Sequence, residues 1–290
     1  MISILLAGFL GLTGTLLGTR LAIGLLVKKG YGQFVRDGGP KEHLKKAGTP
    51  TMGGTVIIVA TVVAYLLAHL LVLRPPTASG LLLLFLFVGL GFVGFLDDWI
   101  KISRARSLGL DSKQKLALQT VIAALFAVAA LNFPDARGVT PATAAISFLR
   151  DLPWFTLPVV VAVLWIMFII AAMSNGANLT DGLDGLLAGV SALVFAAYTI
   201  LNLWQYDRAC FANSPGPQCY EVRDPFDLAL LSLALAGACF GFLWWNASPA
   251  KIFMGDTGSL SIGGALAAVS IFTRTEILAA VIAGLFVVIT

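Results

Sequence analysis

The fold is decided by an apolar, polar, apolar succession in the second half of the chain. Val159–Met173 reads VVVAVLWIMFIIAAM, the next segment runs Asn175-Gly-Ala-Asn-Leu-Thr-Asp-Gly-Leu-Asp-Gly185, and Leu186–Leu203 is again mostly apolar. A carboxylate is costly in hydrocarbon, so Asp181 and Asp184 need a function, a cation or water. The pattern predicts two membrane helices joined by a polar segment that carries chemistry.

The composition of the whole chain points to the same class. Of its 290 residues, 58% are hydrophobic and 12% are charged, and the mean hydropathy is +0.92. Soluble domains carry about 25% charged residues, so we expect an integral membrane protein. The net charge of +4 would suit nucleic acid. In a membrane chain, however, basic residues mark cytoplasmic loops, so we expect no nucleic-acid partner.

Apolar runs of about 20 residues, the length needed to span hydrocarbon, predict an all-α polytopic membrane protein with about nine transmembrane helices. We expect one integral-membrane domain over residues 1–290. Its first span lacks the charged start and cleavage site of a signal peptide. Its last span reaches Thr290 without a cap, so we expect the domain to be incomplete there. The predicted spans are 2–27, 52–73, 80–96, 114–133, 156–173, 186–204, 227–245, 259–273 and 277–290.

The loops between these spans fall into two sets. Loops 28–51, 97–113, 174–185 and 246–258, with the adjoining helix ends, hold all nine lysines and three arginines. The other set is 74–79, 134–155, 205–226 and 274–276, and it holds six basic residues, all of them arginines: Arg74, Arg137, Arg150, Arg208, Arg223 and Arg274. The excess of positive charge predicts that the first set is cytoplasmic and the N-terminus external.

The cysteines agree with this orientation. Cys210 and Cys219 lie in one predicted external loop, where oxidising conditions favour a disulfide; two free thiols are the alternative. Cys239 lies in an apolar helix and is expected to be a packing residue.

The polar motifs lie in the four predicted cytoplasmic loops. They include Lys45–Gly54, Asp97–Lys101, Asn175–Gly185 and Asn246–Leu260. Carboxylate oxygens suit a hard cation such as Mg²⁺, and the lysines offer positive charge to phosphate groups. Together they indicate a metal-bound, phosphate-rich substrate.

The spacing of the aspartates leaves alternatives open. Asp97 and Asp98 should point about 100° apart on a helix, so one can act on a metal or as a base while the other orients a neighbour. A solvated helix end is the alternative for this pair. Asp181 and Asp184 would share a face if their segment is helical; both they and Asp256 could instead cap the helices that follow.

A Gly89-Leu-Gly-Phe-Val-Gly94 run matches a dinucleotide-binding pattern. It lies inside an apolar helix rather than between a strand and a helix, which excludes that function. Close helix packing through small residues is the expected role.

Four segments resemble the phospho-N-acetylmuramoyl-pentapeptide transferase family, within the polyprenyl-phosphate N-acetylhexosamine-1-phosphate transferase superfamily. They are Lys46–Gly54, Gly94–Asp98 with Lys101, Asn178–Gly185, and Phe253–Ser259, and they occur in order over residues 46 to 260. The resemblance implies a multi-pass protein of the bacterial inner (plasma) membrane with an active-site cleft at the cytoplasmic face. Family members have ten helices and a further histidine-rich loop that this sequence does not show.

The activity implied by the resemblance is transfer of phospho-MurNAc-pentapeptide from its UDP carrier to undecaprenyl phosphate, giving lipid I and UMP in peptidoglycan biosynthesis. The implied partners are UDP-MurNAc-pentapeptide, undecaprenyl phosphate and membrane lipid, and the implied cofactor is Mg²⁺. A homodimer is compatible with it.

The resemblance also implies roles for particular residues. Asp256 would bind the metal, and Asp97 and Asp98 would serve the polyprenyl phosphate, one of them as a base. The uridine pocket would contain Lys46, Gly182, Asp184, Asn246 and Phe253. The remaining cleft residues would be Asn178, Asp181, Lys101 and Lys113, with Thr51 and Leu183 also binding substrate. Direct attack and an aspartyl-phosphate intermediate both remain open.

Three other functions compete with this one. A related transferase would use UDP-GlcNAc as its donor. A cation-coupled transporter would place its carboxylates near the membrane midplane, whereas these cluster toward one face. A CDP-alcohol phosphotransferase would need a different aspartate pattern from Asp181-Gly-Leu-Asp-Gly185.

Overall fold

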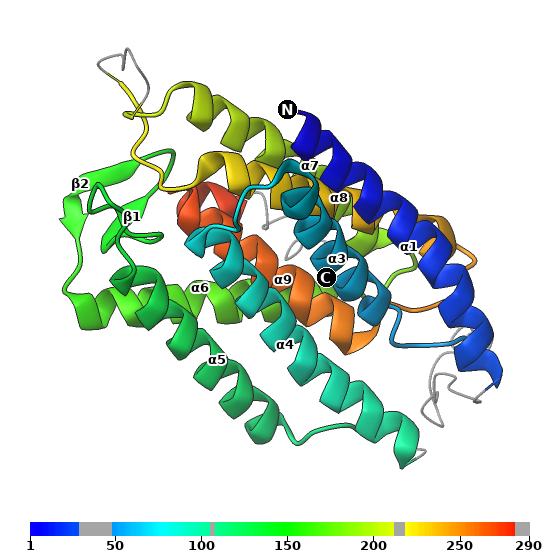
Figure 1. The fold of residues 1–290 in the computed structure, drawn as a ribbon. Helices are drawn as coiled ribbons and strands as arrows, with labels where there is room; N and C mark the ends of the chain where they lie inside the picture. The colour runs from blue at the N-terminus through cyan, green and yellow to red at the C-terminus, as the bar shows by residue number, and fades with distance from the viewer. Residues whose placement is uncertain (29–47, 105–107, 212–217, 282–290) are drawn as a thin grey trace.

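The computed structural model describes residues 1–28, 48–104, 108–211 and 218–281, which form an elongated bundle of helices (Figure 1). Within these residues, seven helices are long and apolar enough to cross a membrane, which confirms the all-α polytopic class. They are α1 (Ile2–Lys28), α3 (Gly54–Val72), α4 (Ala78–Ser103), α5 (Ser112–Asn132), α6 (Val159–Thr180), α7 (Leu186–Asp207) and α8 (Pro225–Asn246). An eighth helix, α9 (Gly255–Phe272), is shorter and richer in small residues.

Each predicted span from 2–27 to 259–273 corresponds to one of these helices, but several helices extend past the predicted bounds, α4 and α6 by the most residues. Helix α4 runs to Ser103 and α6 to Thr180, so segments predicted as loops are their last turns. The physical reason is that hydropathy marks where hydrocarbon ends, whereas backbone hydrogen bonding can continue beyond it. The predicted span 277–290 lies mostly outside the described residues; residues 276–281 are helical.

Helix α9 lies inside the bundle, where it packs against α3, α4 and α6. Its residues from Thr257 to Phe272 are all buried. Small residues permit this close approach: a Cβ on Gly263 would lie 2.5 Å from the backbone oxygen of Met173, and one on Gly94 would lie 2.1 Å from that of Asp256. The glycine run of α4 therefore serves helix packing, as predicted.

A small hairpin at one end of the bundle was not predicted from the sequence. Strands β1 (Ala145–Ser147) and β2 (Asp151–Thr156) pair antiparallel within a segment expected to be a loop. The Ser147 backbone N–H donates to Glu276 at 2.9 Å, and Arg274 donates to the backbone oxygens of Thr140 and Pro141. The hairpin thus depends on contacts from a distant part of the chain. The alternation of apolar and polar residues in a short segment, by which strands are predicted, cannot reveal such contacts.

The cysteine predictions are confirmed. Cys210 and Cys219 form a disulfide, and Cys239 is a buried free thiol in α8.

Candidate active site

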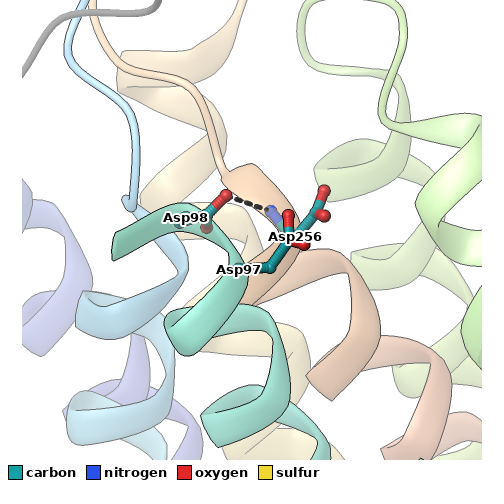
Figure 2. Close-up of side chains that lie close together, drawn as sticks. All are labelled: Asp97, Asp98 and Asp256. Carbon is teal, nitrogen blue, oxygen red and sulfur yellow. Dashed lines mark hydrogen bonds between the residues drawn. The ribbon is translucent and has the colours of Figure 1, made fainter. Parts of the chain in front are cut away.

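Three carboxylates meet where the C-terminal part of α4 crosses the N-terminus of α9 (Figure 2). One oxygen from each of Asp97, Asp98 and Asp256 lies within 4.8 Å of the other two. Asp97 and Asp98 are only 3% exposed, which excludes a freely solvated helix end. The absence of a side chain at Gly94 allows the two helices to approach closely enough for this cluster to form.

Asp98 caps the N-terminus of α9 from another helix. It accepts a hydrogen bond from the backbone N–H of Asp256 at 3.2 Å (Figure 2). It also accepts from the backbone N–H of Thr257 at 2.9 Å and from the Thr257 hydroxyl at 2.7 Å. The unpaired N–H groups of a helix N-terminus favour a negative charge there. The alternative in which Asp256 caps its own helix is therefore wrong: Met254 occupies the N-cap position, and its side chain makes no capping hydrogen bond.

Asp97 faces a different set of partners. Its Oδ1 accepts the Leu110 backbone N–H at 2.8 Å, and its Oδ2 lies 2.5 Å from the Lys101 ammonium nitrogen. The two neighbouring carboxylates diverge, as helical geometry requires. Asp97 Oδ2 therefore pairs with an ammonium group, whereas Asp98 pairs with the N-terminus of a helix.

Two lysines neutralise part of the negative charge. Lys101 Nζ lies 3.1 Å and Lys115 Nζ lies 2.7 Å from Asp256 Oδ2. Asn178 satisfies both ends of its amide when its nitrogen donates to Asp256 at 3.3 Å and its oxygen accepts from Lys115 at 3.1 Å. Helix α6 therefore contributes to the cluster as well.

Lys115 was not among the site residues implied by the family resemblance, although it is one of the lysines expected to offer positive charge to phosphate groups. Lys113 was expected to line the cleft, but it is exposed and makes no contact with the carboxylates among the described residues. Both lie in the first turns of α5, and two residues on a helix point about 200° apart. Only one of them can face α9, and the sequence did not show which face of α5 is packed.

The charges shift the acidity of Asp256. Burial alone would raise the pKa of this carboxyl, but its hydrogen bond with Asp97 and the ammonium groups of Lys101 and Lys115 hold the pKa below its usual value. Three carboxylates against two ammonium groups leave an excess of negative charge, which favours a cation in the cluster.

Asp181 and Asp184 do not share a helix face. Helix α6 ends at Thr180, and residues 181–185 form a turn before α7. The capping alternative also fails, because Gly185, with a φ of 77°, occupies the N-cap position. Burial, followed by the charges of Asp256 and Asp98, raises the pKa of Asp181 well above its usual value. Asp184 instead accepts the Ala250 backbone N–H at 3.3 Å.

Asn246 uses both ends of its amide within the protein. It is 2% exposed, accepts the Gly185 N–H at 3.1 Å and donates to the Ile252 backbone oxygen at 2.9 Å. These bonds join the turn before α7 to the segment before α9. The geometry indicates that Asn246 positions the walls of the site.

The segments before α3 and before α9 are joined through their backbones. The Gly53 N–H donates to the Phe253 oxygen at 2.9 Å, and the Phe253 N–H donates to the Pro50 oxygen at 2.8 Å. This pairing brings Thr51 beside the N-terminus of α9, where its hydroxyl lies 3.0 Å from the place of a Cβ on Gly255.

The remaining predicted substrate residues differ in exposure. The Phe253 side chain is half-buried, and Gly182 and Leu183 are exposed at the tip of the 181–185 turn. Lys46 lies outside the described residues.

The donor set fits a hard divalent cation. All three candidate ligands are carboxylate oxygens, which Mg²⁺ prefers, and one oxygen from each lies within 4.8 Å of the other two. The structure therefore contains an acidic group able to hold a metal ion.

Comparisons with known proteins are consistent over nearly the whole chain. A family model described as glycosyl transferase family 4 matches residues 80–274, and a phospho-N-acetylmuramoyl-pentapeptide-transferase signature matches residues 46–58. A protein named phospho-N-acetylmuramoyl-pentapeptide-transferase from Cutibacterium acnes is 56% identical over 289 residues, which cover 99% of this chain and 81% of the relative. Proteins of the same name from Streptomyces griseus and a Nocardioides species are each 58% identical, with 99% of this chain covered and 81% and 80% of the relatives.

Proposed function

The chain belongs to the phospho-N-acetylmuramoyl-pentapeptide-transferase family, and from this premise we propose that it transfers phospho-MurNAc-pentapeptide from UDP-MurNAc-pentapeptide to undecaprenyl phosphate. The products are lipid I and UMP, in peptidoglycan biosynthesis. The observation that carries the proposal is the cluster of Asp97, Asp98 and Asp256 with Lys101 and Lys115. Family membership identifies the substrates, and the cluster supplies groups suited to a diphosphate.

The reaction exchanges one phosphorus–oxygen bond for another. An oxygen of the lipid phosphate attacks the phosphorus that bears the sugar, and the bond from that phosphorus to the UMP oxygen breaks. Both substrates are anionic, so they repel each other unless positive charge lies between them. Lys101 and Lys115 are placed to provide that charge, because both ammonium groups contact Asp256.

We assign different roles to the two neighbouring aspartates. Asp98 is engaged by three donors at the start of α9, so it positions Asp256. Asp97 Oδ2 faces the Lys101 ammonium group instead of a helix N-terminus, so we assign to Asp97 the acceptance of a proton from the lipid phosphate. Mg²⁺ held by Asp97, Asp98 and Asp256 would neutralise phosphate charge and stabilise the departing UMP.

The arrangement suits substrates from two phases. The acceptor is a membrane lipid and the donor is a soluble nucleotide, so the site must lie at a membrane boundary. The cluster lies at the ends of α4, α6 and α9 and near the start of α5, which meets that need. We infer a multi-pass protein of the bacterial plasma membrane with this end in the cytoplasm; a homodimer stays a prediction.

The test is release of UMP by the purified protein in the presence of Mg²⁺, UDP-MurNAc-pentapeptide and undecaprenyl phosphate. Asp256→Asn should lower this rate by about 10³-fold, since it removes a metal ligand and charge at the reacting phosphates. The matched control is Asp111→Asn. Asp111 is exposed at the start of α5, and its carboxylate makes no capping hydrogen bond to that helix.

Asp111→Asn should retain activity within about twofold, as expected for a surface change. Turnover of UDP-GlcNAc in place of the muramoyl donor would refute the proposed substrate. Full activity of Asp256→Asn would refute the proposed site.

A further inference from the structure

A cavity lies at the end of the bundle opposite the carboxylates. Its volume is about 450 Å³, and it is bounded by the N-terminus of α1, the C-terminal ends of α3 and α7, and the start of α8. Thr77, which precedes α4, lines it. Twenty residues of α4 separate Thr77 from Asp97, which corresponds to about 30 Å of helix. That length matches the hydrocarbon thickness of a bilayer, so the cavity lies near the other membrane boundary.

Arginine is concentrated in this cavity. Arg74, Arg137 and Arg223 line it, and they are half of the six arginines in the loops of this end. Arg137 pairs with Asp135 at 2.5 Å and stacks on Phe211, and Arg223 lies 3.3 Å from Asp224. The Arg74 side chain has no hydrogen bond or ion pair within the part of the chain that the structure describes.

The two carboxylates that line the cavity already accept hydrogen bonds from neighbouring side chains and backbone. Asp227 accepts from Tyr65 at 2.9 Å, from His69 at 2.8 Å and from both the N–H and the hydroxyl of Thr77. Asp224 accepts from the Ser79 hydroxyl at 2.5 Å. The acidic groups therefore stabilise the junction of α3, α4 and α8, and the Arg74 guanidinium remains available to an anion.

The rest of the lining is largely apolar and reaches the surface. Val72, Tyr206 and Phe211 line the cavity and are each at least 40% exposed. Phe226 and Leu230 continue the apolar wall inward from the start of α8. The cavity thus combines a cationic rim with an apolar wall open to the surroundings, which complements an anionic group attached to a hydrocarbon chain.

We propose that this cavity binds the phosphate headgroup of an anionic phospholipid from the leaflet opposite the reaction site, with Arg74 contacting the phosphate. Guanidinium groups bind phosphate oxygens in a bidentate manner, and basic pockets between membrane helices bind anionic headgroups. One acyl chain would lie against Val72 and Tyr206. The site is separate from the transferase cluster, so it does not depend on the function proposed above.

The test is lipid retention by the full chain in mixed micelles of phosphatidylglycerol and phosphatidylcholine, counted by native mass spectrometry. The unchanged protein should retain phosphatidylglycerol preferentially, and Arg74→Gln should weaken that binding about tenfold, the loss expected for a charge-assisted contact. Val72→Trp, which narrows the cavity and keeps the three arginines, should weaken it as well. Melting temperatures should stay close to that of the unchanged protein, because the Arg74 side chain makes no hydrogen bond or ion pair among the described residues.

The matched control is Arg208→Gln. Arg208 is exposed at the same end and stacks on Trp204 at 5.0 Å, but it does not line the cavity. It should retain lipid as the unchanged protein does. If Arg208→Gln lost as much phosphatidylglycerol as Arg74→Gln, the effect would be one of surface charge only, and the site would be overturned. Unchanged lipid retention in Arg74→Gln would also overturn the site. Complete displacement of the lipid by millimolar inorganic phosphate would show a small-anion site and overturn the lipid assignment.

Discussion

Asp97 and Asp98 are neighbours in the chain but have different partners in the structure. Asp98 holds the N-terminus of α9 through three hydrogen bonds, and Asp97 faces Lys101 and the Leu110 N–H. The sequence predicted that the pair would diverge. It did not predict that one of them caps a helix more than 150 residues away, because capping across helices leaves no local pattern.

The lysines near the start of α5 provide a sharp test of the site. Lys115→Met should lower UMP release about 10²-fold, because it removes an ammonium group 2.7 Å from Asp256 Oδ2 where phosphate charge must be balanced. Lys113→Met, two residues away and exposed, should remain within about twofold of the unchanged protein. Steady-state rates at saturating Mg²⁺ measure both. A larger loss of UMP release in Lys113→Met than in Lys115→Met would show that α5 turns the Lys113 face toward the carboxylates.

The contact between α4 and α9 creates the site. Helix α9 is central because it is built from small residues that allow neighbouring backbones to approach. Hydropathy predicted a span at 259–273, but the helix begins at Gly255, so Asp256 belongs to the helix rather than to a loop before it. The packing of α9 against α4 therefore determines where the Asp256 side chain lies and toward which neighbours it points.

Gly94→Ala should separate these two helices. The added Cβ would lie 2.1 Å from the Asp256 backbone oxygen, and backbone cannot yield as a flexible side chain can. We expect destabilisation of about 1–3 kcal/mol from overpacking, together with loss of UMP release. Thermal unfolding in detergent and the activity assay measure the two effects.

Gly24→Ala is the control for this change. Gly24 lies in α1, and a Cβ there would meet no atom within 4 Å, so the melting temperature should be unchanged or slightly higher. A Gly94→Ala protein with an unaltered melting temperature and rate would contradict the proposed packing role.

The whole molecule has two chemically distinct ends. One carries the carboxylates and lysines, and the other carries the hairpin, the disulfide and the arginine-lined cavity. Figure 1 shows the hairpin and the C-terminal end of α4 at opposite ends of the bundle. The distribution of basic residues predicts that the carboxylate end is cytoplasmic.

Labelling of intact spheroplasts with a membrane-impermeant maleimide tests this orientation. Trp154→Cys, at a side chain 76% exposed in strand β2 of the hairpin, should be labelled from outside. Leu183→Cys, 61% exposed in the 181–185 turn, should be labelled only after the membrane is permeabilised. The disulfide and the buried Cys239 thiol should contribute little background. Labelling of Leu183→Cys in intact spheroplasts would reverse the orientation.

Composition, hydropathy and the four motifs were sufficient to predict the membrane class, eight of the helices and the family. The reason is that crossing hydrocarbon imposes a length and an apolar character on each segment that can be read locally. The disulfide followed from similar reasoning, because it depends on which side of the membrane a loop occupies.

Only the tertiary structure decided which of these residues meet. It selected Lys115 over Lys113, assigned the capping of α9 to Asp98, placed Asp181 and Asp184 in a turn instead of on one helix face, and formed a cavity lined by three arginines. Each depends on the rotation of one helix against another, and that rotation is set by side-chain packing between segments far apart in the sequence. A linear pattern records which residues can do chemistry, whereas packing determines which of them face each other.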